Sequence, residues 1–439
     1  MSAIALERRS EGGTTALVRF AQTGFFGLYL LSGLQAYALG PIPFDWFAQF
    51  GFIGLALTLF FLGRPLPMPY LRPYAWIVGW AVVVTAIGAG THDFASMMPE
   101  VSTSSYPIFI GLRFLVFASF SATAYVVAWI LTHGDSERLF RTLIGIGTAL
   151  AIVALYIYVA PALGLPEPPR TRLGTAGGEQ FTTFSYAFHR ALGTFREPSH
   201  LASWILIPFF VSVGRNGVLP TIPTLLMGGA LLLTGSLTGI LSAAIGFLAA
   251  TLLFGSKRST GLRVSLQMSM VVAAGAVLFL VWTQVGSSES ANLFEALGDR
   301  IVPILEAGGL EDTNRGYVFR YISDTGLPFF GLGLGHPNLV MTRDLNLNIT
   351  GVFSNLYIST IARMGWIGLI LMLYAFSQPL LGAWFGRRRA NPKIIWSATA
   401  GYVAWLSIFF VLYEEPTLSF GVATALLMFA AKPEGQPSD

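Results

Sequence analysis

Two polar segments, residues 165–199 and 286–350, carry arginine but no lysine. Their eight arginines are Arg170, Arg172, Arg190, Arg196, Arg300, Arg315, Arg320 and Arg343. A guanidinium group forms a planar fork that binds phosphate through paired hydrogen bonds, and it is more weakly hydrated than ammonium. Two interpretations are open. The arginines bind a phosphate or diphosphate at a membrane surface, or they are the solvated charges of long loops.

The first segment ends in Arg190-Ala-Leu-Gly-Thr-Phe-Arg-Glu-Pro-Ser-His-Leu-Ala202. Proline is favoured at the first position of a helix, so Glu197-Pro198 predicts that an apolar helix begins there. A helix N-terminus attracts anions, and Arg190 and Arg196 lie close to it in sequence. Glu197 either complements the helix dipole or is a general base beside these arginines.

The second segment contains a short predicted helix between Thr313, which can cap it, and Gly326, which ends it. We expect Arg315 on this helix to contact the anion. Arg320 can instead pair with Asp324 one turn later, so it is a secondary candidate.

A glycine-rich run, residues 331–335, precedes His336 and Asn338. Its spacing is superficially that of a nucleotide-binding loop, but no strand–helix–strand unit surrounds it. We expect a backbone that packs closely or approaches a ligand. On this basis His336 is the second candidate for the base, and Asn338 is a secondary site residue.

The sequence predicts neither a metal nor another cofactor. It contains no cysteine, no Asp-x-Asp motif and no close histidine pair. Two further secondary candidates are His200 and Arg363. Arg363 falls inside a predicted membrane span, as does Arg113, where a charge usually faces a cavity or pairs with a buried acid.

The composition indicates what kind of fold holds these residues in place. Of 439 residues, 54% are hydrophobic and only 11% are charged, and the mean hydropathy is +0.65. Soluble domains carry about 25% charged residues, so we expect an all-α integral membrane protein. Twelve predicted spans lie at 18–40, 44–63, 74–90, 107–131, 140–164, 200–214, 219–234, 237–255, 264–285, 353–380, 394–413 and 417–431.

The short turns fix the predicted orientation. Arginines and all three lysines gather in the turns on one side, which is the positive-inside pattern, and an even number of spans puts both termini in the cytoplasm. Both polar segments then lie outside the cell. The predicted organisation is helices 1–5 in 1–164, a periplasmic loop in 165–199, helices 6–9 in 200–285, a large periplasmic loop in 286–352, and helices 10–12 with a cytoplasmic tail in 353–439.

Most of residues 180–370 resembles the O-antigen polymerase and O-antigen ligase superfamily. The resemblance rests on the Arg190–Ala202 run, the Pro328-Phe-Phe-Gly-Leu-Gly-Leu-Gly335 run, the Leu233–Gly239 turn and Ser354-Asn-Leu-Tyr. It implies a metal-independent, GT-C-like glycosyltransferase of the bacterial inner membrane. Such enzymes transfer glycan from undecaprenyl diphosphate at the periplasmic face. The paired loop arginines of the family correspond to Arg190 and Arg315.

Two positions depart from that pattern. Ligases typically have a histidine where this chain has Ser354, and Leu237 replaces an arginine often found in the turn. The first departure weakens the ligase interpretation, although His336 could supply the imidazole. The sequence around Glu197 is more similar to repeat-unit polymerases for O-antigen, capsule or exopolysaccharide.

Three functions are compatible with these features. The first is a polymerase that moves a growing glycan from undecaprenyl diphosphate to a new lipid-linked repeat unit. The second is a ligase that moves it to lipid A-core or another acceptor, and the third is a lipid-glycan transporter that does no chemistry. The expected partners are the lipid-linked glycans, the bilayer and a chain-length regulator protein, but not nucleic acid.

Overall fold

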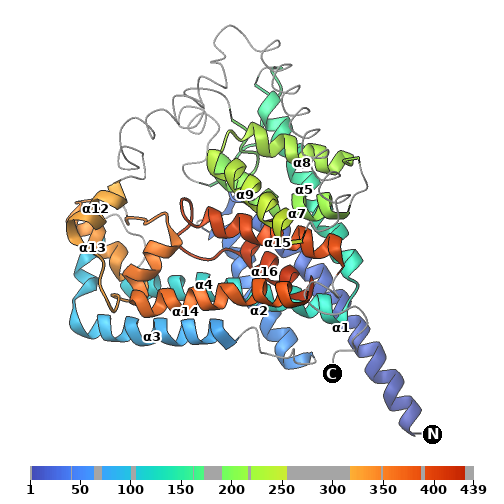
Figure 1. The fold of residues 1–439 in the computed structure, drawn as a ribbon, viewed down its shortest axis with the longest axis horizontal. Helices are drawn as coiled ribbons and strands as arrows, with labels where there is room; N and C mark the ends of the chain where they lie inside the picture. Colours follow the sequence, from blue (N-terminus) through green and yellow to red (C-terminus); the bar gives the residue numbers. More distant parts are fainter. Residues whose placement is uncertain are drawn as a thin grey trace.

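The computed structural model describes residues 2–40, 42–63, 72–99, 105–161, 163–172, 190–215, 219–254, 317–347, 350–386 and 391–430. This part of the chain is almost entirely helical (Figure 1). The helices are α1 Ser2–Ser32, α2 Phe44–Leu62, α3 Arg72–Thr91, η1 Phe94–Met97, α4 Tyr106–His133, α5 Ser136–Val159, α7 Pro198–Arg215, α8 Ile222–Leu233, α9 Leu237–Phe254, α12 Tyr317–Thr325, α13 His336–Asp344, α14 Leu356–Gly386, α15 Pro392–Ile408 and α16 Leu418–Ala430. Two short strands, β1 Ala38–Leu39 and β2 Ile42–Pro43, pair antiparallel between α1 and α2.

The predicted spans correspond to these helices. Each coincides with one of them except 264–285, which lies outside the described residues. Within the described residues, six helices are long and apolar enough to cross a membrane, namely α2, α3, α4, α5, α9 and α14. Helices α8 and α16 are apolar but shorter. The chain is thus a helical integral membrane protein, and the number of twelve spans stays a prediction.

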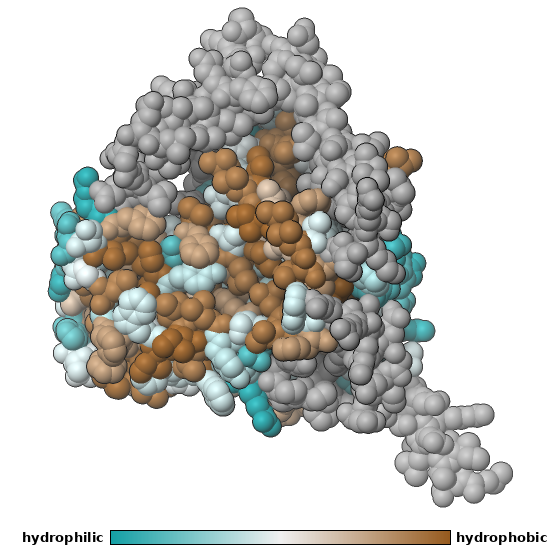
Figure 2. Space-filling model, in the orientation of Figure 1, coloured by the Kyte–Doolittle hydropathy of each residue, from teal (hydrophilic) through white to brown (hydrophobic). Residues whose placement is uncertain are grey.

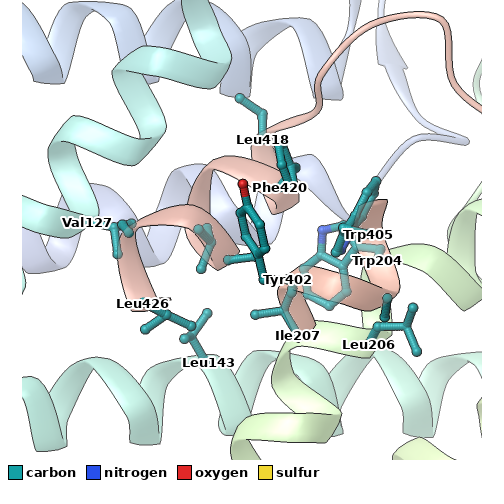
Figure 3. Packing of buried hydrophobic residues seen from close by; sticks show 14 of the residues in the cluster. Val127, Leu143, Trp204, Leu206, Ile207, Tyr402, Trp405, Leu418, Phe420 and Leu426 are labelled. Atoms are coloured by element: carbon teal, nitrogen blue, oxygen red, sulfur yellow. The ribbon is translucent and has the colours of Figure 1, made fainter. Parts of the chain in front are cut away.

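The core lies around α15 and α16. Helix α15 packs against α7, α9 and α16, and α16 packs against α4. Nearly every residue of α16 is buried, as expected of a helix that is apolar on all sides. In Figure 3, Tyr402 of α15 lies beside Phe420 of α16, and their rings stack with centroids 5.0 Å apart.

The apolar surface lies on helices at the outside of the bundle. Helices α3 and α14 run side by side, and both expose large hydrophobic residues, among them Trp76, Ile87, Ile370 and Phe385. Figure 2 shows hydrophobic residues over the middle of this face, with hydrophilic residues at its left and right edges. Such a belt is what contact with lipid requires, because no water is present there to solvate polar groups.

Helix α14 is broken at Gly365, whose φ of +68° lies in the left-handed region. A Cβ at this position would lie 2.3 Å from the carbonyl oxygen of Phe329. The break leaves the carbonyl groups of Ala362 and Arg363 free of helix bonds, and they accept from the backbone N–H groups of Leu332 and Gly333 at 3.0 and 2.8 Å. The glycine-rich run therefore packs directly on α14, which is one of the two roles expected for it. It supports the half-helix that carries Arg363.

The short helix predicted in the second polar segment is also present as α12. It ends at Gly326, whose φ is +74°, as the glycine and the following proline predict.

Candidate functional site

A cavity of about 540 Å³ lies where the ends of α1, α2, α7, α15 and α16 meet. This volume is within the ~300–1,000 Å³ range of ligand pockets. Most of the residues that line it are polar, although Trp204 and Trp405 join it to the hydrophobic core. The sequence-based topology puts these helix ends on one side of the membrane, and the structure brings them to one cavity.

One wall of the cavity is the start of α7. Arg196, Glu197 and His200 all line it. Helix α7 begins at Pro198, and the carbonyl of Glu197 accepts from the backbone N–H of His200 at 3.0 Å, which confirms the helix start predicted from the Glu-Pro pair. The Glu197 carboxylate accepts a hydrogen bond from the Ser199 hydroxyl at 3.1 Å.

His200 is oriented by two neighbours. Its Nδ1 lies 2.9 Å from the side-chain oxygen of Gln35, and its ring stacks on Tyr413 with centroids 5.4 Å apart. An amide oxygen can only accept, so Nδ1 is the donor, and in the neutral ring Nε2 then carries the lone pair. The Tyr413 hydroxyl in turn bonds Ser203 at 2.9 Å.

A second charged group stands at the start of α2. Asp45 lines the cavity and forms an ion pair with Arg172 at 3.2 Å. Arg172 also donates to the backbone carbonyl of Gln35 at 3.0 Å. Asp45 lies in the first turn of α2, where a carboxylate complements the helix dipole. Both Asp45 and Arg172 interact electrostatically with Arg196.

The opposite wall is the turn Glu414-Glu415-Pro416-Thr417, which leads into α16. Two arginines from different helices meet both carboxylates. Arg113 of α4 lies 2.6 Å from Glu414 and 3.0 Å from Glu415, and Arg363 of α14 lies 3.0 Å from each. Two positive and two negative charges therefore form one neutral buried cluster.

Glu414 is the most completely bonded member of the cluster. Its Oε1 accepts a hydrogen bond from Arg113 and forms an ion pair with Arg363, and its Oε2 accepts from the Asn338 side chain at 2.9 Å and the Phe353 backbone N–H at 3.0 Å. Burial raises the pKa of this carboxyl, but the charges of Arg363 and Arg113 and these hydrogen bonds outweigh burial and lower the pKa to about 2. Glu414 is therefore a permanently charged anchor.

Several of the predicted site residues lie outside the cavity lining. Arg190 is buried and donates to the carbonyl groups of Thr234 and Gly235, at 2.7 and 3.5 Å, so it holds the turn between α8 and α9. Arg315 lies outside the described residues. The expected meeting of Arg190 and Arg315 at one anion therefore stays a prediction.

His336 differs most from its expected role. It is fully buried, its Nδ1 lies 2.6 Å from the Leu332 carbonyl, and its Nε2 lies 2.7 Å from the Tyr106 hydroxyl. Its ring stacks on Phe94 with centroids 3.9 Å apart. Burial lowers its pKa. Both ring nitrogens are engaged away from the cavity, so the geometry favours a structural role.

Asn338 and Arg363 belong to the buried cluster. Arg363 donates to Asn338 Oδ1 at 3.0 Å, so α13 is fastened to α14 and to the 414–415 turn. Of the two alternatives for Arg363, a cavity or a buried acid, the structure shows the pair with buried carboxylates. Arg320 is exposed on α12, and between it and Asp324, both of which the structure describes, no ion pair forms, contrary to the expected pairing.

In the part of the chain that the structure describes, no group of three or more histidine, aspartate or glutamate side chains could hold a metal ion. The absence of a metal or other cofactor in the working protein stays a prediction. The charges that the described cavity offers a ligand are those of arginine and carboxylate side chains.

The family model described as O-antigen ligase matches residues 222–373. This match, over about a third of the chain, supports the resemblance to the O-antigen polymerase and ligase superfamily. It spans α8, α9, α12, α13 and the first part of α14, so it includes Asn338 and Arg363. No curated protein matches the chain. The family supports a membrane enzyme of polysaccharide processing.

Sequence reasoning missed the 414–415 turn as a site. A signal was present: Glu197-Pro198-Ser199 and Glu415-Pro416-Thr417 are the same pattern, and each precedes an apolar helix. Arginines stand close to the pattern at 197 in the sequence, whereas no arginine lies near the one at 415. The arginines that accompany it come from α4 and α14, far away in sequence.

Ser354 is a further residue of the cavity. It lines the cavity and adopts a φ of +50°, which is uncommon for a residue other than glycine. This is the position at which the family resemblance leads one to expect a histidine in ligases. The imidazole that lines the cavity is that of His200, whereas His336 lies elsewhere.

Proposed function

We propose that this cavity is the active site of a polymerase for a bacterial surface polysaccharide. The donor is a growing glycan on undecaprenyl diphosphate, and the acceptor is a sugar hydroxyl of a new lipid-linked repeat unit. The observation that carries the proposal is the joint position of Arg196, Glu197 and His200 on one wall of a polar cavity that fits a ligand.

The reaction needs little covalent chemistry from the protein. The acceptor oxygen attacks the anomeric carbon of the donor glycan, the bond from that carbon to the diphosphate oxygen breaks, and undecaprenyl diphosphate leaves. Glu197 receives the proton of the acceptor hydroxyl. Because diphosphate is a competent leaving group, the remaining task is to position both glycans and stabilise the departing negative charge.

Arginine supplies that stabilisation. Arg196 lines the cavity and is exposed, so its guanidinium group is accessible to a diphosphate. Arg190 holds the α8–α9 turn beside this wall, and Arg315 is the second arginine that the resemblance implies. His200, with its Nδ1 proton directed to Gln35, can orient the acceptor hydroxyl through Nε2.

The test is glycan elongation by purified protein in nanodiscs, with the lipid-linked oligosaccharides extracted from the source cells as substrate. We expect Arg196→Ala and Arg315→Ala to abolish the ladder of polymer lengths, and Arg190→Ala to shorten or abolish it. Arg343→Ala, which removes an exposed arginine paired only with its neighbour Asp344, is the matched control. Full-length polymer from all three variants at normal protein abundance would defeat the proposal.

A ligase is the second candidate, because the matching family carries that description. The two activities separate when acceptors are supplied one at a time. A ladder on lipid diphosphate indicates a polymerase, whereas a single capped product on lipid A-core indicates a ligase. Product formation by purified protein without an energy source also excludes a transporter that does no chemistry.

We place the protein in the bacterial inner membrane, with cytoplasmic termini and a periplasmic active site, on the basis of the positive-inside pattern. Cysteine labelling from either side of the membrane tests this, with a reporter cysteine at exposed Glu167 of the 165–172 segment and another at exposed Arg138 of the α5 start. A chain-length regulator protein is a further proposed partner, which co-purification would reveal.

A further inference from the structure

The two oxygens of the Glu415 carboxylate have different surroundings. Oε1 accepts from Arg113 and from Arg363, each at 3.0 Å. No described residue donates a hydrogen bond to Oε2. The side chain is 13% exposed and lines the cavity. One oxygen is therefore held in place by two buried guanidinium groups, and the other is available to a ligand.

The neighbouring Glu414 already makes the structural contacts of this turn. The Glu414 carboxylate accepts hydrogen bonds from three donors, which use both of its oxygens, and forms an ion pair with Arg363, so it already joins α4, α13 and α14. A second carboxylate balances the second arginine, but charge balance alone does not require Oε2 to remain without a donor at the cavity wall. Because the Glu415 side chain lines the cavity, a ligand or water there can donate a hydrogen bond to this oxygen.

The surroundings of Glu415 fit a sugar better than a phosphate. A carboxylate only accepts hydrogen bonds, and sugar hydroxyl groups donate them. A phosphate group would be repelled by this oxygen and attracted instead to exposed Arg196 on the α7 wall. Tyr413 and Trp405 line the cavity near the same turn, and their rings stack on each other with centroids 5.5 Å apart.

The two walls are joined at Tyr413, next to the Glu414-Glu415 pair. Tyr413 stacks on His200 and bonds Ser203, both of α7. A sugar held at Glu415 is thus near the wall that carries the proposed base, Glu197.

We infer that Glu415 is a substrate-binding residue that accepts a hydrogen bond from a hydroxyl group of the acceptor sugar and orients that sugar toward Glu197. The inference rests on the proposed function, because it assigns the acceptor subsite of the same cavity. It also gives the two Glu-Pro turns different roles. The Glu197 carboxylate accepts the proton, and the Glu415 carboxylate binds the sugar.

The experiment measures elongation in nanodiscs with two substrates varied separately, namely purified lipid-linked polymer as donor and extracted lipid-linked repeat unit as acceptor. We expect Glu415→Gln to raise the apparent KM for the repeat unit about ten-fold to a hundred-fold, the usual effect of losing a hydrogen bond to a charged group. The KM for the polymer and kcat should change by less than about two-fold. An interaction that binds the ground state and the transition state equally affects only the KM of the substrate that it holds.

Glu415→Asp is the second variant, because it keeps the charge that balances the two arginines but is one methylene shorter. It should also raise the KM for the repeat unit, with the melting temperature close to that of the unaltered protein. If Glu415→Gln does not fold, this variant decides. Glu167→Gln, at an exposed carboxylate outside the cavity, is the control.

An unchanged KM for the repeat unit in the folded variants overturns the inference, as does a fall in kcat alone. Loss of folded protein in both variants assigns Glu415 to the scaffold and also overturns it. The proposed function fails separately, when the unaltered protein does not elongate the extracted glycan at all.

Discussion

Two turns of the same local sequence pattern line the cavity in different electrostatic settings. Glu197-Pro198-Ser199 begins α7 and Glu415-Pro416-Thr417 leads into α16, and both glutamates line one cavity. Glu197 accepts from a serine hydroxyl two residues away and stands next to exposed Arg196. Glu415 is held by two arginines of other helices. The same short pattern thus directs a carboxylate into the cavity, but distant residues decide its charge environment.

This difference separates chemistry from binding. Glu415 is fixed at one oxygen by two guanidinium groups and is proposed to hold a hydroxyl group, whereas Glu197, beside a serine hydroxyl, is the proposed acceptor of the proton.

The largest effect is expected for Glu197→Gln. An amide cannot accept the proton of the acceptor hydroxyl, so we expect kcat of elongation to fall about 10²- to 10⁴-fold, the usual contribution of a general base. The measurement is single-turnover elongation in nanodiscs, with Glu167→Gln as the matched control. Retention of more than a tenth of the activity would remove Glu197 as the base, and His200→Ala would then be the next variant to measure.

The second effect concerns stability. Glu414→Ala leaves Arg113 and Arg363 buried with one carboxylate between them, and removal of one partner from a buried ion pair costs about 3–5 kcal/mol. We expect a large fall in the melting temperature in detergent, together with loss of abundance in the membrane. Glu197→Ala should leave both nearly unchanged, because Glu197 is only half-buried. Equal effects of the two substitutions would show that the two turns do not differ as described.

The smallest effect is a pH dependence. The pKa of Glu414 is lowered from its usual 4.5 to about 2 by its arginine partners. A lowered pKa in the folded state means that the stabilisation is complete above pH 4.5 and is lost as the pH falls toward 2. The difference in melting temperature between the unaltered protein and Glu414→Gln should therefore be constant from pH 8 to pH 5. It should shrink only below about pH 4.5, and a loss near pH 6 would contradict the assignment.

The glycine-rich run shows why local patterns can mislead. Gly331, Gly333 and Gly335 all adopt left-handed φ values, and a Cβ on Gly331 would lie 2.5 Å from the backbone nitrogen of Gly365. The glycines are needed because two backbones approach closely at the break in α14. His336 follows this run, and it is buried between Phe94 and Tyr106 rather than presented to a ligand. Its chemistry is explained by packing, which no local spacing reveals.

The arginines show the same limit. Sequence reasoning selected Arg190, Arg196 and Arg315 from two polar loops, and Arg196 lines the cavity. Arg190 instead donates to a carbonyl group of the α8–α9 turn. Arg113 and Arg363, which the sequence indicated only as residues of secondary interest, form the ion cluster with Glu414. Whether a guanidinium group faces a cavity or a carbonyl depends on neighbours that are tens or hundreds of residues away.

The sequence by itself determined the class of the protein, the positions of its apolar helices and the start of α7 at the Glu-Pro pair, because these depend on hydropathy over some twenty residues and on the restricted backbone of proline. Only the tertiary structure decided which carboxylates share the cavity. Glu414 and Glu415 meet Arg113 and Arg363 about 300 and 50 residues away along the chain, at 301, 302, 51 and 52 residues of separation. Long-range electrostatic pairing is set by how helices pack, and no short stretch of sequence contains it.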